Sequence, residues 1–160
     1  MRSIAAKVFI IMAITAIAAF GADSSLGTWK YNITRGRTSS TSTNPLVGAI
    51  IVWESTPDGG VKQTVTGRLA DGTPVNYSFT LKYDGKEYPA TGAPFDTISA
   101  QRIDANTWSW DAKKTGGKYH VHGITVISKD GKTMTQTSIG TDTDGTRFSS
   151  TFILDRQQGL

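Results

Sequence analysis

His120 and His122 are the two histidines of the chain, and a single residue separates them. On a β-strand, residues two apart project from the same face about 7 Å from each other, so both rings can approach one metal ion. A zinc centre usually takes three or four protein ligands. The chain has no cysteine, so a carboxylate such as Asp111 or Glu54 would have to complete the set. We expect no bound metal and keep the two histidines as weak candidate ligands.

The motifs of common enzyme classes are absent from the sequence. It contains no Gly-x-Ser-x-Gly nucleophile elbow, no phosphate-cradling glycine loop and no dinucleotide-binding fingerprint. Its glycines fall instead where tight turns are needed. We therefore expect a protein that is not an enzyme and that has neither catalytic residues nor a cofactor.

Aromatic residues offer a stronger functional lead, because several occupy alternating positions of the expected strands. Alternate residues of a strand share one face, so such side chains can line one interior space. These side chains either contact a small hydrophobic ligand or form a solid core that needs them for stability, and the sequence leaves both interpretations open. The candidate ligand-binding residues are Tyr77, Phe79, Trp108, Trp110, Phe148 and Phe152.

The elements that would position these residues alternate with turns at a regular spacing. Asp-Gly pairs favour the positive backbone angles of tight hairpin turns. They occur at residues 58–59, 71–72, 84–85, 130–131 and 144–145. Between them apolar and polar residues alternate, most clearly over residues 75–83, as in strands with one buried face. We expect strands at residues 27–33, 48–56, 61–70, 74–84, 95–104, 107–114, 118–128, 133–140 and 146–156, and a surface loop over 34–44.

This series of strands indicates a closed fold. An open antiparallel sheet exposes unpaired backbone groups at its edges, and closing the sheet removes those edges. We predict an all-β fold, an antiparallel up-and-down meander that closes into an eight- to ten-stranded lipocalin-like barrel. The interior of such a barrel is either filled by side chains or just wide enough for one small ligand.

Three segments carry a resemblance to a known family. Gly27-Thr28-Trp29-Lys30 resembles the Gly-x-Trp signature on the first strand of lipocalins and fatty-acid-binding proteins, and residues 129–156 resemble their last hairpin. Residues 82–104 resemble a pattern in uncharacterised exported bacterial lipocalin-like proteins. The resemblance implies a calycin-type barrel in which the first-strand Trp closes one end under an Arg of the last strand. The positions that match this signature are Gly27, Trp29 and Arg156.

The chain departs from fatty-acid-binding proteins at two places. Those proteins insert a helical pair between their first two strands, whereas residues 34–47 are too few and too polar to hold one. They also anchor a carboxylate with Arg-x-Tyr on the last strand, where this chain has Thr151-Phe152-Ile153-Leu154. The anchoring mechanism therefore does not carry over to this chain. Arg147, at the start of the last expected strand, could replace the anchoring arginine only because it lies nearby in the sequence.

The first 21 residues have the layout of a secretory signal peptide. Arg2 and Lys7 precede an apolar run over residues 8–20, and small residues follow. The run is shorter than the about 20 apolar residues of a membrane-spanning helix. We expect cleavage between Ala18 and Ala22 and export to the periplasm or the extracellular space, with a retained anchor as the alternative.

Removal of residues 1–21 leaves 139 of the 160 residues, which suits a single lipocalin-like β-barrel domain over residues 22–160. The formal net charge of +4 then falls by two, because the segment carries Arg2, Lys7 and no acidic residue. No clustered basic stripe remains, so we expect no nucleic-acid partner. The absence of cysteine also excludes a disulfide scaffold.

Three functional hypotheses remain. The first is an exported carrier or sensor of a small hydrophobic ligand, and the second is a structural or interaction module with a filled core. The third is an eight-stranded outer-membrane barrel, which needs a lipid-facing apolar band that residues 133–139 lack. We therefore expect a monomer without stable membrane insertion of the mature chain.

Overall fold

Alternating apolar and polar residues form eleven antiparallel strands in the computed structural model, which describes residues 23–38 and 45–158. This part of the chain contains no helix that could cross a membrane. The predicted signal peptide and its cleavage region lie outside the described residues. The strands are β1 (Gly27–Tyr31), β2 (Arg37–Thr38), β3 (Leu46–Ser55), β4 (Val61–Leu69), β5 (Pro74–Leu81), β6 (Asp84–Thr91), β7 (Thr97–Asp104), β8 (Thr107–Lys113), β9 (His120–Ile127), β10 (Thr133–Thr141) and β11 (Arg147–Gln157).

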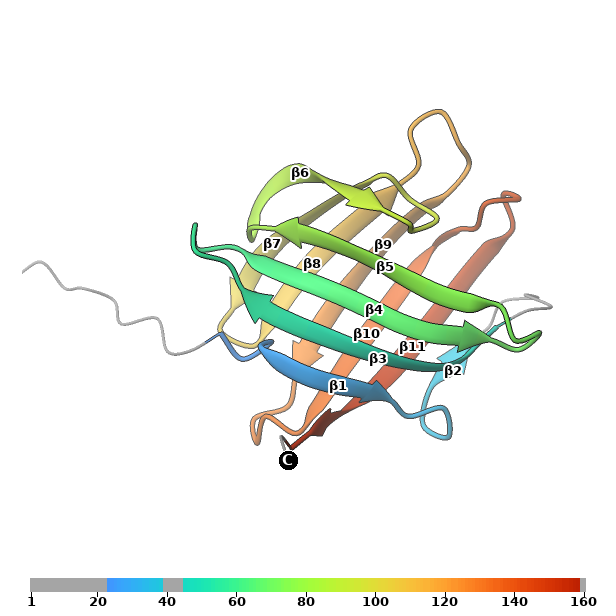
Figure 1. Ribbon diagram of the computed structural model, residues 1–160. Coiled ribbons are helices and arrows are strands. Elements are labelled where there is room, and N and C mark those ends of the chain that lie inside the picture. The colour runs from blue at the N-terminus through green and yellow to red at the C-terminus, as the bar shows by residue number, and fades with distance from the viewer. Residues whose placement is uncertain (1–22, 39–44, 159–160) are drawn as a thin grey trace, which may run out of the picture.

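Ten of these strands close into a barrel in which neighbours in the sequence pair with each other (Figure 1). β1 completes the ring, because Trp29 lies opposite Ile51 of β3 on one side and opposite Arg156 of β11 on the other. The short β2 pairs with β11 beyond the end of β1. The predicted all-β up-and-down meander, closing with eight to ten strands, is confirmed.

Four of the five Asp-Gly pairs lie in turns between strands, whereas Asp84-Gly85 begins β6, and in all five pairs only the glycine adopts a left-handed backbone. Gly72 has a φ of +90°, and no described residue other than glycine has a positive φ. The Gly72 N–H donates to the Leu69 carbonyl at 3.0 Å, and the Thr73 N–H donates to the Asp71 carboxylate at 2.8 Å. Glycine therefore supplies the backbone angle and aspartate an acceptor for the N–H two residues later. The glycine of each pair therefore takes the positive backbone angle, whereas the aspartate does not.

The sequence pattern missed the barrel strand β6. Lys86 and Glu87 interrupt the alternation that marks the other strands, and Pro89 has no N–H to donate. β6 pairs with β5 at two positions and with β7 through an irregular register. The strand expected over residues 74–84 therefore ends at Leu81, and the next strand begins at Asp84.

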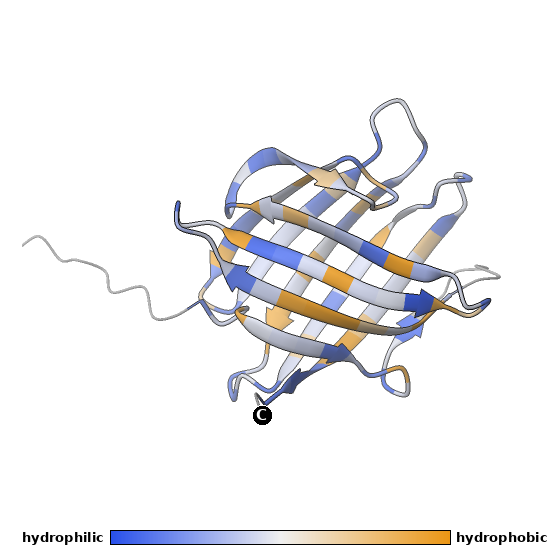
Figure 2. Cartoon of the chain, viewed as in Figure 1, coloured by the Kyte–Doolittle hydropathy of each residue, from blue (hydrophilic) through white to orange (hydrophobic). Residues whose placement is uncertain are grey.

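Inward-facing apolar side chains form the core of the barrel, and the largest of them fill one end of it. Along β9 buried and exposed residues alternate, so that Val121 and Ile127 face inward while His120 faces out. Figure 2 shows the matching alternation of hydrophobic and hydrophilic positions along several strands. The largest fully buried apolar side chains are Trp29, Leu81, Trp108, Met134 and Leu154.

Candidate functional site

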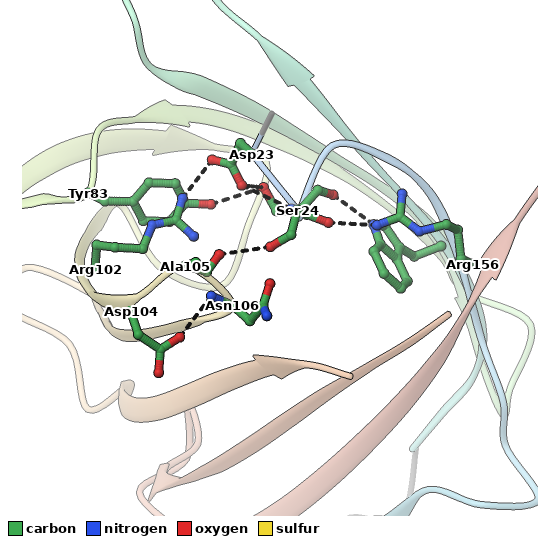
Figure 3. Close-up of polar contacts among 10 residues, drawn as sticks. Asp23, Ser24, Tyr83, Arg102, Asp104, Ala105, Asn106 and Arg156 are labelled. Carbon is green, nitrogen blue, oxygen red and sulfur yellow. Dashed lines mark hydrogen bonds and ion pairs between the residues drawn. The ribbon is translucent and has the colours of Figure 1, made fainter. Parts of the chain in front are cut away.

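Residues 23–26 cross the solid end of the barrel, which we call the base. The indole N–H of Trp29 donates to the Ser25 carbonyl at 2.8 Å, and Arg156 donates to the Ser24 and Leu26 carbonyls at 2.6 Å each. Figure 3 shows Arg156 reaching toward Ser24 at this end. These bonds connect the N-terminal segment to the last strand and close the base.

The structure brings the three signature residues together at the base. The Arg156 guanidinium carbon lies 4.1 Å from the centroid of the Trp29 ring, a cation–π arrangement. Gly27 has a φ of +119°, and a Cβ atom there would lie 2.8 Å from Arg156 Nη1. Gly27 is therefore needed both for its backbone angle and for the space that the guanidinium takes.

A second arginine, Arg102, pairs with Asp23 at the base, with Nη2 2.6 Å from Oδ2 (Figure 3). Its guanidinium lies 3.6 Å from the centroid of the Tyr83 ring. Burial, followed by the charge of Asp23, raises the pKa of Tyr83 to about 12, so its hydroxyl stays neutral beside Ser25. Sequence reasoning missed this cluster, because its members lie on segments far apart in the chain.

Beyond the base the barrel encloses a cavity of about 780 Å³. Ligand pockets in proteins typically measure about 300 to 1,000 Å³. Leu81 and Trp108 lie at the base side of the cavity, and loop residues of the opposite end, among them Pro45, Pro94 and Thr143, form its rim. The interior is therefore filled at the base and hollow toward the rim.

All six aromatic residues proposed from the sequence line this one cavity, where β5, β8 and β11 place them: Tyr77, Phe79, Trp108, Trp110, Phe148 and Phe152. Their contact with a ligand stays a prediction. Sequence reasoning missed Trp53, Phe95 and Tyr119, which also line the cavity. The alternation of Ala49, Ile51 and Trp53 on β3 could have revealed Trp53. Phe95 and Tyr119 fall within the strands expected over residues 95–104 and 118–128, but in the structure they lie just before β7 and β9.

The aromatic side chains contact one another in a continuous series. Trp53 packs edge to face on Trp108, with ring centroids 5.9 Å apart, and on Phe79 at 6.4 Å. Phe95 continues the series to Tyr77 at 5.8 Å and to Tyr119 at 5.9 Å. Such contacts hold the rings in defined orientations.

Gly123 fixes the position of Trp110 on the cavity wall. A Cβ atom at Gly123 would collide with the Trp110 ring, so the missing side chain lets the indole lie across β9. The indole N–H then donates to the Thr125 hydroxyl at 3.2 Å. A strand glycine therefore shapes the wall through packing.

A polar strip crosses the cavity wall on β9 to β11, and it consists of Thr125, Gln136, Ser138 and Ser150. The Ser138 and Ser150 hydroxyls share a hydrogen bond of 2.8 Å. Gln136 pairs in register with Thr125 and donates to the sulfur of Met134 at 3.8 Å, a weak acceptor. The strip places hydrogen-bonding groups beside the aromatic surface.

Two tyrosines add neutral hydroxyl groups to the cavity. Burial raises the pKa of Tyr77 to about 12 and also raises the pKa of Tyr119 above its usual range. Both side chains therefore remain un-ionised at neutral pH.

His120 and His122 lie on the outside of the barrel, not in the cavity. The Nε2 atom of His120 is 2.9 Å from Asp111 Oδ2, and the Nδ1 atom of His122 is 3.9 Å from the same oxygen. Glu54, the other carboxylate considered, pairs in register with Lys62 on β3 and β4. Among residues 23–38 and 45–158 no three His, Cys, Asp or Glu residues are placed to hold a metal ion.

Arg147 also lies away from the cavity. It is exposed at the start of β11 and lines a separate hollow of about 420 Å³ together with both histidines. The residue that stood nearest to a carboxylate anchor in the sequence is therefore not part of the cavity wall.

Comparison with protein-family models and with curated proteins finds no match. Solved structures do match. The fluorescent protein UnaG is 10% identical with a TM-score of 0.51, over 82% of this chain and 96% of that one. A point mutant of UnaG is 9% identical with a TM-score of 0.55, over 85% and 98%. The protein EF1p2_mFAP2b, bound to DFHBI, is 13% identical with a TM-score of 0.52, over 85% and 96%. At these identities the likeness shows a shared fold, a closed antiparallel β-barrel.

Proposed function

We propose that this chain is an exported, non-catalytic lipocalin-like carrier or sensor that binds a small hydrophobic molecule inside its barrel. The cavity of about 780 Å³, lined by aromatic side chains, carries the proposal. A core built only for stability would fill this space, because protein interiors pack at close to crystal density.

The structural comparison supports a binding role for such a barrel. EF1p2_mFAP2b is described as bound to DFHBI, so a barrel of similar fold accommodates a small molecule. The layout of residues 1–21 supports export, as it does for other secretory precursors. The mature domain would then meet its ligand in the periplasm or outside the cell and act as a monomer.

Titration with Nile red, an uncharged environment-sensitive dye, tests the proposal on the protein without residues 1–21. We expect saturable binding, quenching of tryptophan fluorescence and a higher melting temperature, because a ligand that binds only the folded state stabilises it. At a hundredfold excess over Kd the gain is about 2.7 kcal/mol.

Variants separate the cavity from the outer surface. Phe79→Ala and Trp110→Ala remove apolar contact area from the cavity wall and should weaken dye binding about tenfold. His120→Ala is the matched control, because His120 lies outside and should leave binding unchanged. The proposal is wrong if a folded sample shows no saturable binding of Nile red or of a panel of lipids, quinones and haem.

A further inference from the structure

We infer that the ligand of this cavity is an uncharged, flat, conjugated molecule with hydrogen-bonding groups at its edge, and not a fatty acid or another anion. This inference rests on the proposed function and specifies its ligand. Three properties of the cavity carry it: its charge, the shape of its walls and the placement of its polar atoms.

The cavity offers no positive charge to an anion. Among the described residues that line it there is no Lys, Arg or His, and its single charged side chain is that of Asp142 near the rim. Residues 39–44, which the structure does not describe, carry no charged side chain in the sequence. A carboxylate inside this cavity would lose its hydration without gaining a cationic partner.

The interior arginines are already engaged elsewhere. Arg102 pairs with Asp23, and Arg156 donates to the carbonyls of Ser24, Leu26 and Gly131. Both therefore stabilise the base, and neither lines the cavity, although the buried Nη1 of Arg102 has no hydrogen-bond partner among the described residues. This leaves the cavity electrically neutral up to its rim.

The walls present broad ring faces. Tyr77 and Phe79 follow each other on β5 with their rings only 16° from parallel and their centroids 6.4 Å apart. The Trp110 ring is held across β9 by Gly123. Aromatic faces fixed in this way gain more from an offset-stacked planar ligand than from a flexible chain, which also loses conformational entropy on binding.

The polar atoms of the wall favour a ligand with hydrogen-bonding groups. Trp53 lines the cavity, and its buried indole N–H has no hydrogen-bond partner within the described part of the chain. Such a donor is costly to leave unpaired, so an acceptor on the ligand would stabilise the complex once the indole turns its N–H, which is closed to solvent in this structure, toward the cavity. The polar strip provides a second set of partners on another part of the wall.

A matched pair of probes tests the charge. 1-Pyrenebutanol and 1-pyrenebutyrate share one flat ring system and differ in the charge of the head group. We expect the alcohol to displace Nile red from the protein without residues 1–21 at a Kd about tenfold lower than the carboxylate, because only the carboxylate loses a full ionic hydration shell. Equal or tighter binding of the carboxylate would overturn the inference and leave the proposed function intact. Failure of Nile red, of both probes and of the panel of lipids, quinones and haem to bind would instead refute the proposed function.

The shape is tested with 1-hexadecanol, which is uncharged but not flat. We expect it to displace Nile red less effectively than 1-pyrenebutanol at the same concentration. If hexadecanol displaces the dye equally well, the preference for a planar ligand is wrong.

Trp53→Phe tests the hydrogen bond, since it keeps an aromatic ring and removes the N–H. We expect about three- to tenfold weaker binding of 1-pyrenebutanol and little change for 1-butylpyrene, which has no acceptor. An equal loss for both probes would show that Trp53 acts by packing alone and would overturn this part of the inference.

A gain-of-function variant tests the charge preference independently of whether Trp53→Phe folds. Gln136→Lys adds one cation to the polar strip, and Gln136→Leu is its uncharged control. We expect about tenfold tighter binding of 1-pyrenebutyrate to the lysine variant only. If neither variant changes the affinity for the carboxylate, charge does not control ligand choice in this cavity.

Discussion

Trp29 shows how a single side chain organises one end of the barrel. It is fully buried on β1, donates a hydrogen bond to Ser25 and stacks under Arg156. It therefore connects the N-terminal segment, the first strand and the last strand. The short Gly-x-Trp motif predicted its importance, but the carbonyls that Arg156 binds could not be identified from the motif.

Replacing Trp29 with alanine should lower the free energy of unfolding by about 3 to 5 kcal/mol, because a large buried ring is lost and the cavity left behind cannot collapse fully. Urea denaturation of the protein without residues 1–21 measures the change. Trp110→Ala is the control and should cost less, because Trp110 already borders an open cavity. A loss below about 1 kcal/mol for Trp29→Ala would show that this ring does not support the base.

The Asp-Gly turns are elements in which charge and backbone geometry act together. The hydroxyl of Thr56 and then the ammonium of Lys82 hydrogen-bond Asp58 and lower its pKa to about 2 from an ordinary 3.8. Backbone N–H groups likewise lower the pKa of Asp84 and Asp144. The ionised carboxylates therefore favour the folded state. Their contribution is present above the ordinary pKa and is lost as the pH falls toward the folded-state pKa.

We expect a constant melting temperature from pH 7 to roughly pH 5 and a progressive decrease between roughly pH 4 and pH 2. Circular dichroism over this pH range provides the measurement. The double variant Asp58→Asn and Asp144→Asn should show a shallower decrease, because asparagine keeps an acceptor but does not titrate. An identical acid profile for the variant would mean that other groups cause the loss.

The seam between β5 and β6 is the weakest pairing of the barrel wall. These strands pair at two positions, whereas β9 and β10 pair at eight consecutive positions. Local opening costs less where fewer backbone hydrogen bonds must break. We expect the amide protons of β6 to exchange with solvent faster than those of β9 and β10, measured by hydrogen–deuterium exchange. Equal protection of the three strands would contradict this ranking.

At the scale of the whole molecule, the outer surface argues against a lipid-facing barrel. The outward side chains of β4 are those of Lys62, Thr64, Thr66 and Arg68. A membrane barrel needs an apolar band at this position on every strand, since charges there are costly in lipid. Apolar side chains are exposed on β3, β7, β9 and β10, among them Ile50, Ile103, Ile124 and Ile139, but β4 does not continue this apolar surface around the barrel.

We therefore expect the chain without residues 1–21 to stay in solution in the absence of detergent and to show a β-rich far-ultraviolet spectrum. Size-exclusion chromatography in detergent-free buffer tests this together with the expected monomer. Recovery of folded protein only in detergent would support the outer-membrane alternative.

The sequence by itself determined the class of fold and most of the strands. Alternation and turn chemistry involve residues two to four positions apart, so both can be recognised in the sequence without knowledge of any tertiary contact. They predicted the meander, the closure and the apolar face that Tyr77 and Phe79 share on β5. They failed at β6, because its few backbone bonds and bulged register do not require an alternating pattern.

Only the tertiary structure decided what the inward faces enclose. Whether a barrel is hollow depends on how strands distant in sequence pack across the interior, which no local pattern records. Closure placed residues of β5, β8 and β11 on one cavity, turned both histidines and Arg147 outward, and used Arg102 and Arg156 at the base. The neutrality of the cavity, and hence the kind of ligand it favours, results from that closure, because a charge acts on a ligand only where the fold places it.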